Sequence, residues 1–289
     1  MADPARYRLG RRSVSRIGYG AMQLTGPGVF GPPADPANAV RLLRTAVDLG
    51  IDHLDTAQYY GPDVVNDLIR EALHPYPESL AIVSKVAVRR GSRGEILPYD
   101  EPAELRVGIE DNLRSLGTER LAAVNLRMPD PTALPDARFD DQLAAMIQAR
   151  DDGLIEGIGL SNVSSAQLQH ALDITEIVTV QNSFSLLERG SADVLDLTSQ
   201  HGISFAPYLP LGWPQPRRMQ PLEHPTVQAI ATRTGATPTQ VVLAWLLGLA
   251  PNVLLIPGTG SILHLRENVA AGELDLLPEE RDALSALSN

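Results

Sequence analysis

The spacing of hydrophobic and polar positions changes about every thirty residues, between short apolar runs and the three-to-four-residue spacing of amphipathic helices. The apolar runs predict strands at 17–22, 52–56, 80–86, 121–127, 154–160, 177–182, 203–208 and 252–257. The other pattern predicts helices at 64–73, 102–116, 140–151, 165–172, 192–200, 225–234, 238–249, 262–271 and 278–287. Such alternating units with right-handed crossovers close into an α/β barrel of the (β/α)8 (TIM) type, whose active site lies on the loops after the strands.

Both ends of the chain add to this alternation. Residues 7–15 contain two short segments around Gly10, which predict a β-hairpin that covers one end of the barrel. Segments 238–249 and 278–287 predict extra C-terminal helices, the first capped by Thr237. With 289 residues, 44% of them hydrophobic, and no linker or low-complexity tract, we expect one barrel domain over 1–289.

The stretch that carries the chemistry is IDHLDTAQYYGP at 51–62, a short buried strand that breaks into a turn. Tyr60 follows this strand, and a phenol with a pKa of about 10 is an efficient proton donor at neutral pH only if its surroundings tune it. Lys85, at the end of the next apolar run, can supply a positive charge, and Asp55 can keep that lysine charged by pairing with it. The three residues form a candidate proton-donating unit.

At these residues the chain resembles the aldo-keto reductases. The family pattern DTAxxYG is present as Asp55, Thr56, Ala57, Tyr60 and Gly61. The family's lysine matches Lys85. The resemblance implies an NAD(P)H-dependent oxidoreductase on a (β/α)8 barrel, with Asp55, Tyr60 and Lys85 as catalytic residues. An isolated Asp, Tyr and Lys would instead indicate a buried strand with an ion pair, but further matches at other strand ends argue against that alternative.

The resemblance assigns those further matches to cofactor binding. Ser161, Asn162 and Gln181 would bond the nicotinamide carboxamide, and Tyr208 would stack on the nicotinamide ring. The expected cofactor-binding residues are Gly20, Met22, Ser161, Asn162, Gln181, Tyr208, Leu211, Gly212, Gly258, Thr259, Ser261, His264, Glu267 and Asn268, of which the last two would hold the adenine. Without the resemblance, Asn162 is typical of a helix cap and Tyr208 of a half-buried tyrosine at the barrel end.

Arg127 is the first departure from the family pattern. The family's fourth catalytic residue is a histidine, and aligning the segment VNLRMPDP places Arg127 at that position. Arginine stays charged and cannot shuttle a proton, although it can polarise a carbonyl or bind an anionic group. We expect Arg127 to act as a catalytic residue, to lower the pKa of Tyr60 further and to be oriented by Asn125. The alternative is that it turns away and pairs with Asp55 or Glu156.

The second departure concerns the phosphate that distinguishes NADP from NAD. The usual family pattern has a lysine and an arginine there, and this chain has Gly258 and His264. Ser261 begins a helix whose backbone N–H groups can bind a phosphate, and Arg266 follows it. We therefore expect NADPH as cofactor, with NADH as the alternative. The proline-rich loop 211–225, which carries Trp213, would cross the pyrophosphate.

Two other motifs are expected to have lesser roles. A literal G-x-G-x-x-G at 26–31 is not expected to bind a dinucleotide, because two prolines separate it from the next helix, which Asp35 caps and Gly50 ends. We expect that loop to form a lip beside the substrate. Arg89, Arg90 and Arg93 are expected in a solvated charged loop, with attraction of an anionic substrate as the alternative.

Composition excludes several other functions. The formal net charge of -11 argues against nucleic acid or an anionic membrane as a partner. The absence of cysteine excludes disulfides and zinc-thiolate sites, and the six histidines form no H-E-x-x-H motif, so no metal site is expected. The longest apolar run ends at Pro251, too short to span a bilayer, and no signal peptide is visible, which predicts a cytoplasmic protein.

These observations predict an NADPH-dependent reductase that acts on a small-molecule carbonyl substrate, an aldehyde, ketone or related C=X group. The alternative is a nicotinamide-binding redox sensor or regulatory subunit, resembling the potassium-channel beta subunits, in which turnover is incidental. The arginine in place of the histidine keeps this alternative open. No pattern in the loops that would line the pocket names the substrate, and nothing in the sequence indicates the oligomeric state.

Overall fold

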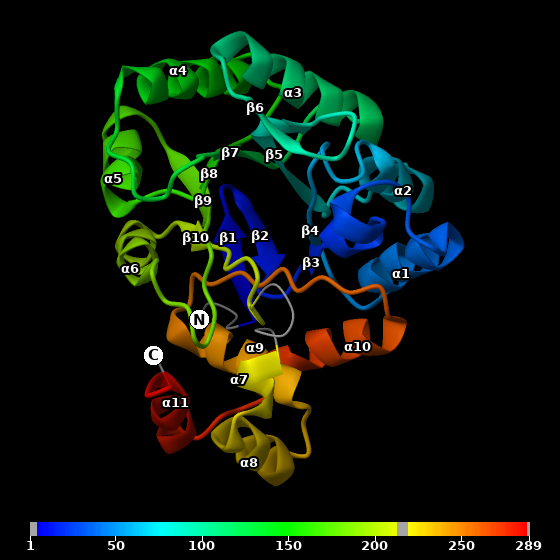
Figure 1. The fold of residues 1–289 in the computed structure, drawn as a ribbon, viewed down its shortest axis with the longest axis vertical. Helices are drawn as coiled ribbons and strands as arrows, with labels where there is room; N and C mark the ends of the chain where they lie inside the picture. Colours follow the sequence, from blue (N-terminus) through cyan, green and yellow to red (C-terminus); the bar gives the residue numbers. More distant parts are fainter. Residues whose placement is uncertain (1–4, 213–218, 288–289) are drawn as a thin grey trace.

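Parallel strands form the wall of a barrel in the computed structural model, which describes residues 5–212 and 219–287 (Figure 1). Their order around the wall is β10, β9, β8, β7, β5, β4, β3, so that each strand lies beside its neighbour in sequence apart from the excursion to β6. The strands are β3 (Tyr19–Gly20), β4 (His53–Asp55), β5 (Ala81–Arg90), β7 (Ala123–Arg127), β8 (Ile158–Ser161), β9 (Ile177–Gln181) and β10 (Ser204–Phe205).

The wall closes through the segment that follows Pro251. Ile17 forms a parallel bridge with Leu255, and Phe205 forms one with Val253. The Gly18 N–H donates to the Leu255 carbonyl at 2.8 Å, which joins this segment to the chain that leads into β3. The strand expected at 252–257 thus lies in the predicted place but makes only isolated bridges. Pro257 lacks an N–H group, so the ladder cannot continue beyond it.

Helices surround the wall on its outer side, as Figure 1 shows. They are α1 (Pro36–Asp48), α2 (Val64–Leu73), α3 (Pro102–Leu116), α4 (Ala137–Asp151), α5 (Ser165–Ile174), α6 (Ala192–His201), α7 (Met219–Glu223), α8 (Pro225–Thr234), α9 (Pro238–Leu249), α10 (Ile262–Ala270) and α11 (Pro278–Ser285). The helices α3, α8 and α9 have the predicted bounds, because a proline occupies the first turn of each. Helix α4 begins earlier than expected, because Asp136 caps it by accepting the Phe139 N–H at 2.9 Å.

An N-terminal hairpin closes one end of the barrel, as predicted. It consists of β1 (Arg6–Leu9) and β2 (Arg12–Ser15), which pair antiparallel. Leu9 and Val14 are buried in a cluster with alanines and valines from the beginnings of the barrel strands, including Ala81. Arg12 pairs with Glu156 at 2.6 Å at the rim. The hairpin therefore covers one end of the barrel, while the carboxyl ends of the strands lie at the open end.

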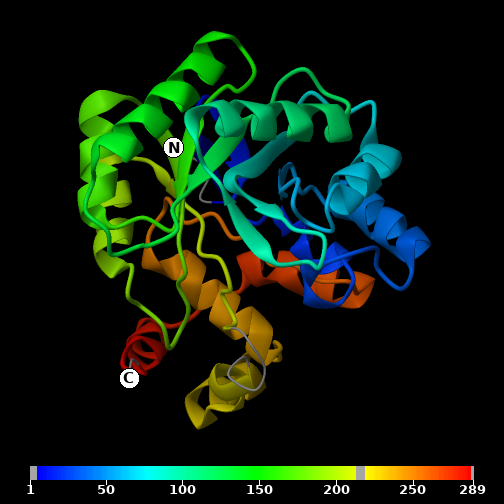
Figure 2. The same ribbon diagram turned by 45° about the horizontal axis from the view of Figure 1, so that its top comes forward.

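A second hairpin at that open end was not predicted. Strand β5 continues beyond the expected strand to Arg90 and pairs antiparallel with β6 (Ile96–Tyr99), as Figure 2 shows. The Gly91 N–H donates to the Glu95 carbonyl at 2.9 Å and the Gly94 N–H to the Gly91 carbonyl at 3.0 Å, which closes the turn. The arginines expected in a solvated loop thus lie on or beside this hairpin.

The glycine-rich loop after β3 folds on itself. It contains the short 3-10 helices η1 (Ala21–Leu24) and η2 (Pro27–Val29), and a third, η3 (Ala271–Glu273), follows α10. The Gly26 N–H donates to the Gly31 carbonyl at 2.9 Å, and the Gly31 N–H donates to the Gly61 carbonyl at 3.0 Å. The loop does not lead directly into a helix, and it lies beside the end of the Tyr60 segment, as expected of a lip.

Candidate active site

A buried ion pair lies at the carboxyl end of neighbouring strands. Lys85 Nζ donates a hydrogen bond to Asp55 Oδ1, and a second one to the Thr56 carbonyl at 3.2 Å. Gln181 Nε2 donates to the other carboxylate oxygen of Asp55 at 2.8 Å. The side chains of Lys85 and Asp55 are 6% and 8% exposed, so both charges are removed from water and depend on these bonds. Lys85 is the single lysine of the chain.

Tyr60 packs against this pair. Lys85 Nζ lies 5.2 Å from the centroid of the Tyr60 ring, and the Tyr59 ring meets Tyr60 edge-on with centroids 5.3 Å apart. Burial raises the pKa of Tyr60 well above its ordinary value, Asp55 raises it further, and Arg127 and Arg90 act in the opposite direction. Arg127 thus lowers this pKa as expected, but the expected net lowering was wrong, because burial outweighs the cations. The lysine charge is largely balanced by Asp55, so desolvation of the phenolate decides the direction.

Arg127 ends β7, next to Ser161 in the register, and is partly exposed. Within residues 5–212 and 219–287 its side chain makes no hydrogen bond and no ion pair. Its positive charge lowers the pKa of Tyr59, Tyr60 and Tyr208 against the larger effect of burial.

Arg127 neither takes the alternative pairing with an acidic residue nor is oriented by Asn125 as expected. It does not pair with Asp55, which binds Lys85 and Gln181, nor with Glu156, which binds Arg12. Asn125 does not orient it either, because the Asn125 side chain is buried over Gly159, which has no Cβ to exclude it. In the part of the chain that the structure describes, both polar atoms of that side chain lack a hydrogen-bond partner.

The residues expected around the nicotinamide gather beside Arg127. Ser161 and Gln181 end β8 and β9 and are paired in the register. The Tyr208 hydroxyl donates to Asn162 Oδ1 at 3.2 Å, while Asn162 Nδ2 donates to the Met128 carbonyl at 2.8 Å. Asn162 has a φ of 60° and is not a helix cap, since Ser164 caps α5. In this group, the Gln181 amide already donates a hydrogen bond to the Asp55 carboxylate.

A second group of expected residues lies across the open end, where β3 meets the chain before α10. A Cβ at Gly20 would collide with the Ile256 carbonyl oxygen, and one at Gly258 would lie 2.6 Å from the Gly20 carbonyl oxygen. The Tyr19 hydroxyl donates to the Thr259 carbonyl at 2.7 Å. Only glycine permits this approach, so the two backbones form one continuous surface.

Helix α10 begins at this surface. Ser261 is its N-cap, and its hydroxyl oxygen accepts the His264 N–H at 3.4 Å. His264 is exposed, and its side chain pairs with no acidic residue among the described residues. Asn268 is 5% exposed, and Glu267 is partly exposed. Met22 lies in η1 and is partly exposed.

The end of the described segment before residue 213 carries the remaining expected residues. Leu211 is buried, and Gly212, with a φ of 81°, donates its N–H to the Leu209 carbonyl at 2.8 Å. Trp213, which was expected in the loop over the pyrophosphate, lies outside the described residues.

Tyr59 was missed by the sequence reasoning, and Arg90 was expected in a solvated loop, with attraction of an anionic substrate as the alternative. Arg90 Nη1 donates to the Gly94 carbonyl at 2.6 Å and Nε to the Tyr59 carbonyl at 3.4 Å, so the β5–β6 hairpin is tied to the Tyr60 segment. Arg89 lies 5.1 Å from the centroid of the Tyr99 ring.

A cavity of about 200 Å³ beneath this hairpin is lined by Tyr59, Lys85, Arg90 and neighbouring residues. The available signal was the alternating run VAVRR followed by the turn sequence GSRG.

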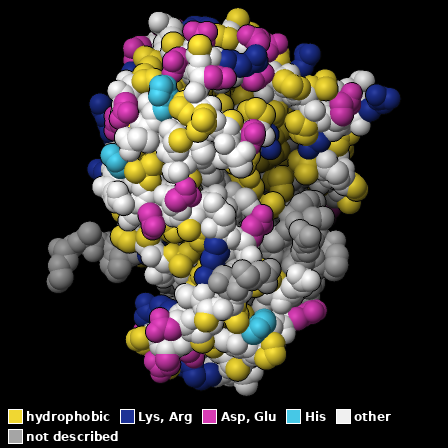
Figure 3. Space-filling model, turned by 60° about the vertical axis from the view of Figure 1, so that its left-hand side comes forward, with side chains coloured by type: hydrophobic (Ala, Val, Ile, Leu, Met, Phe, Trp, Pro, Cys, Tyr) yellow, Lys and Arg dark blue, Asp and Glu magenta, His cyan; other side chains and the backbone are white. Residues whose placement is uncertain are grey.

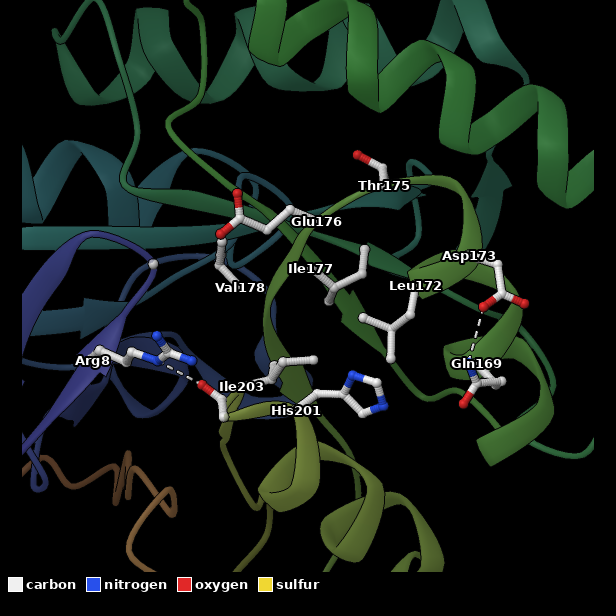
Figure 4. A pocket seen from close by; sticks show the side chains of 12 residues that line it. Arg8, Gln169, Leu172, Asp173, Thr175, Glu176, Ile177, Val178, His201 and Ile203 are labelled. Carbon is white, nitrogen blue, oxygen red and sulfur yellow. Dashed lines mark hydrogen bonds between the residues drawn. The ribbon is translucent and has the colours of Figure 1, made fainter.

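A separate cavity of about 260 Å³ lies toward the opposite end of the barrel (Figure 4). Arg8 of the N-terminal hairpin lines it together with Glu176 and His201, and Arg8 Nε donates to the Gly202 carbonyl at 2.8 Å. Active sites of such barrels lie at the carboxyl ends of the strands, so this cavity is distinct from the candidate site.

The described residues contain neither a candidate membrane-spanning helix nor a candidate metal site. No helix there combines the length and the apolar character that crossing a membrane requires. No group of three or more His, Cys, Asp or Glu side chains there is arranged to hold a metal ion.

The sequence is similar to known oxidoreductases. The model of the aldo/keto reductase family matches residues 16–289. Pyridoxine 4-dehydrogenase of Escherichia coli is 46% identical over 284 residues, which cover 98% of this chain and 98% of that protein. An uncharacterised oxidoreductase of Schizosaccharomyces pombe is 34% identical over 274 residues, which cover 94% of this chain and 86% of that protein.

Solved structures agree with the fold. A thermostable aldo-keto reductase, Tm1743, solved with the inhibitor epalrestat, superposes with a TM-score of 0.81 at 30% identity over 98% of this chain and 99% of that one. An aldo/keto reductase from Klebsiella pneumoniae solved with NADP and acetate gives a TM-score of 0.81 at 26% identity, covering 98% and 95% of the two chains. The chain therefore belongs to the aldo/keto reductase family and is an NAD(P)H-dependent oxidoreductase with a (β/α)8 barrel.

Proposed function

We propose that the chain reduces an aldehyde with NADPH and catalyses the reverse oxidation of the alcohol, with Tyr60 as the proton donor in reduction. The observation that carries the proposal is the contact of Tyr60 with the buried pair of Lys85 and Asp55 at the strand ends. Family membership supports the oxidoreductase class. The roles of the individual residues rest on their geometry and chemistry.

Each residue of this cluster has a distinct task. When bound, the dihydronicotinamide supplies a hydride to the carbonyl carbon. As the C=O electron pair moves onto oxygen, that oxygen takes the proton of the Tyr60 hydroxyl. Burial raises the pKa of Tyr60, so the phenol holds its proton at neutral pH until the alkoxide develops. Lys85 then stabilises the phenolate that remains, and Asp55 and Gln181 keep the ammonium in place.

Several features of the chain fit NADPH. At Gly20 and Gly258 the two backbones approach each other so closely that only glycine fits, and we infer that a long cofactor lies against the backbone there. The N-terminus of α10, at Ser261, presents N–H groups and the positive end of the helix dipole to a phosphate. His264 and Arg266 are exposed on the same turns of the helix and add donors for an anion. These residues would hold the ribose phosphate of NADPH, so we infer a preference for NADPH over NADH.

The substrate that we propose is pyridoxal, which is reduced to the alcohol pyridoxine. The relative at 46% identity is a pyridoxine 4-dehydrogenase, which supports this alcohol and aldehyde pair.

The test is consumption of reduced cofactor by the purified protein with pyridoxal and with simple aldehydes, followed by absorbance. We expect pyridoxal to be reduced faster than benzaldehyde, one pyridoxine to form for each NADPH consumed, and NADH to serve less well. Pyridoxine offered with NADPH is the control, because it has no carbonyl to reduce. A protein that binds NADPH but consumes it with none of the aldehydes would contradict the proposal and favour the redox-sensing alternative.

A further inference from the structure

Arg127 is a permanent cation at the open end of the barrel, and no acidic side chain of the described residues pairs with it. No side chain of the described residues forms an ion pair or hydrogen bond with it. Arg127 ends β7 at the open end beside Ser161 in the register and is partly exposed, and its charge acts on Tyr59, Tyr60 and Tyr208. These phenols keep their protons at neutral pH and supply no negative charge. A partly buried cation in such surroundings is stabilised when a ligand brings the missing anion.

We infer that Arg127 recognises an ionised hydroxyl on the ring carbon next to the one that bears the aldehyde, and so selects ortho-hydroxy aromatic aldehydes. The inference rests on the proposed function, because it concerns the substrate of the same site. A guanidinium presents parallel N–H groups in a rigid fork, which matches two neighbouring oxygens, here the aldehyde oxygen and the phenolate oxygen. A neutral imidazole at this position would donate one N–H and no charge.

The chemistry of the reaction favours this arrangement. An ionised hydroxyl next to an aldehyde pushes electron density toward the carbonyl carbon and so opposes attack by hydride. A guanidinium bound to both oxygens withdraws that density, while Tyr60 remains free to donate its proton. Pyridoxal carries a hydroxyl on the carbon next to its aldehyde-bearing carbon. An arginine in place of the family's histidine is thus suited to this substrate and not to simple aldehydes.

The test is binding in the complex with NADP+, in which no reduction occurs. The ligands are 5-nitrosalicylaldehyde, whose hydroxyl is ionised at neutral pH, 3-nitrobenzaldehyde, which lacks the hydroxyl, and 2-methoxy-5-nitrobenzaldehyde, whose oxygen cannot ionise. We expect calorimetry to give the first ligand a Kd roughly 10- to 100-fold below those of the other two. Imines at surface lysines do not compete, because Lys85 is the single lysine and is buried.

Three variants make the test specific. Arg127→His should abolish the preference while still binding 3-nitrobenzaldehyde, and Arg127→Lys, which keeps the charge without the fork, should retain only part of it. Arg281→His is the matched control, because that arginine is exposed on α11 and pairs only loosely with Asp275 at 3.7 Å. It should leave the preference unchanged.

Equal dissociation constants for the three aldehydes, or a preference that survives in Arg127→His, would overturn the inference. So would Arg127-dependent binding of phenylglyoxylate without any preference among the aldehydes, because the arginine would then take a carboxylate. Binding is independent of turnover, so failure of the proposed function is recognised separately. A protein that shows the Arg127-dependent preference but reduces no aldehyde would support the recognition and reject the reductase assignment.

Discussion

Tyr60 lies between opposing influences on its proton. Burial and Asp55 raise its pKa, Arg127 and Arg90 lower it, and burial prevails. A phenol with a raised pKa is a reliable reservoir for a proton but a weak acid. In the proposed reaction the developing alkoxide becomes the stronger base and takes this proton, and the nearby Lys85 would stabilise the phenolate that remains. The local environment thus favours the protonated state before the reaction and limits the cost of losing the proton during it.

His53, two residues before Asp55, leads to a prediction about stability. It is 3% exposed, and burial lowers its pKa from 6.5 to about 4, although Asp52 and Asp55 act in the opposite direction. The unfolded chain takes up this proton near pH 6.5 and the folded chain only near pH 4, so the stabilisation is complete above pH 6.5 and is lost as the pH falls toward 4. The loss from this residue is on the order of 3 kcal/mol.

Urea unfolding of the wild type and of His53→Gln between these pH values measures the effect. Glutamine does not titrate, so the variant should show a flatter dependence of unfolding free energy on pH. The slope is the readout, and a uniform loss of stability in the variant does not alter it. Identical slopes in the two proteins would show that the histidine does not contribute to the acid sensitivity.

Individual residues of the site differ in how far the sequence reveals them. Asp55, Tyr60 and Lys85 lie at the ends of short apolar runs, and the geometry of parallel strands brings such ends together. The direction of the Tyr60 pKa shift was not predictable from the sequence. It depends on how completely the ring is buried and on which groups accept the hydrogen bonds of Lys85. The free guanidinium of Arg127 likewise depends on Asp55 and Glu156 being paired elsewhere.

At the scale of elements, the N-terminus of α10 gives a prediction that separates stability from cofactor choice. Ser261→Ala removes the N-cap and one hydroxyl near the proposed phosphate site. It should lower the unfolding free energy by about 1 kcal/mol. It should also raise the Kd for NADPH roughly 5- to 10-fold and leave that for NADH nearly unchanged. Thermal unfolding and fluorescence titration with both cofactors measure these effects.

Thr237→Ala is the matched control for this prediction. Thr237 caps α9 by accepting the Gln240 N–H at 3.3 Å and belongs to no proposed cofactor contact. The control should lose similar stability while its preference for NADPH remains that of the wild type. If Ser261→Ala weakened NADPH and NADH in parallel, the helix start would not be the phosphate site.

Helices were easier to predict than strands in this chain, for physical reasons. Proline in the first turn and capping side chains mark helix starts locally, as in α3 and α9. Strand lengths depend on partners that are distant in sequence. β10 has two residues, and the segment after Pro251 makes only isolated bridges. In both, the number of ladder hydrogen bonds depends on the adjacent strands. β6 was missed because Ile96–Tyr99 is mostly exposed and has no core-facing apolar run.

At the scale of the whole molecule, the buried cluster of the N-terminal hairpin and the candidate site lie at opposite ends of the barrel. The N-terminal hairpin fills one end, and the glycine-rich loop and the β5–β6 hairpin flank the other. Acidic and basic side chains are interspersed on the face shown in Figure 3. Against a net charge of -11, Arg90 and Arg127 supply positive charge at the open end, close to Tyr60. This placement favours a substrate with negative charge.

Transfer of deuterium tests the central claim most directly. Wild type and Tyr60→Phe are each incubated with pyridoxal and NADPH deuterated at its transferable position, and the pyridoxine formed is analysed by mass spectrometry over time. The wild type should place one deuterium on the former aldehyde carbon. Tyr60→Phe should bind NADPH with unchanged affinity and form the same product about 100- to 10,000-fold more slowly, because the proton donor is absent. Absence of deuterated pyridoxine from the wild-type reaction, or a variant rate within about threefold of the wild-type rate when proton donation normally contributes far more, would contradict the account.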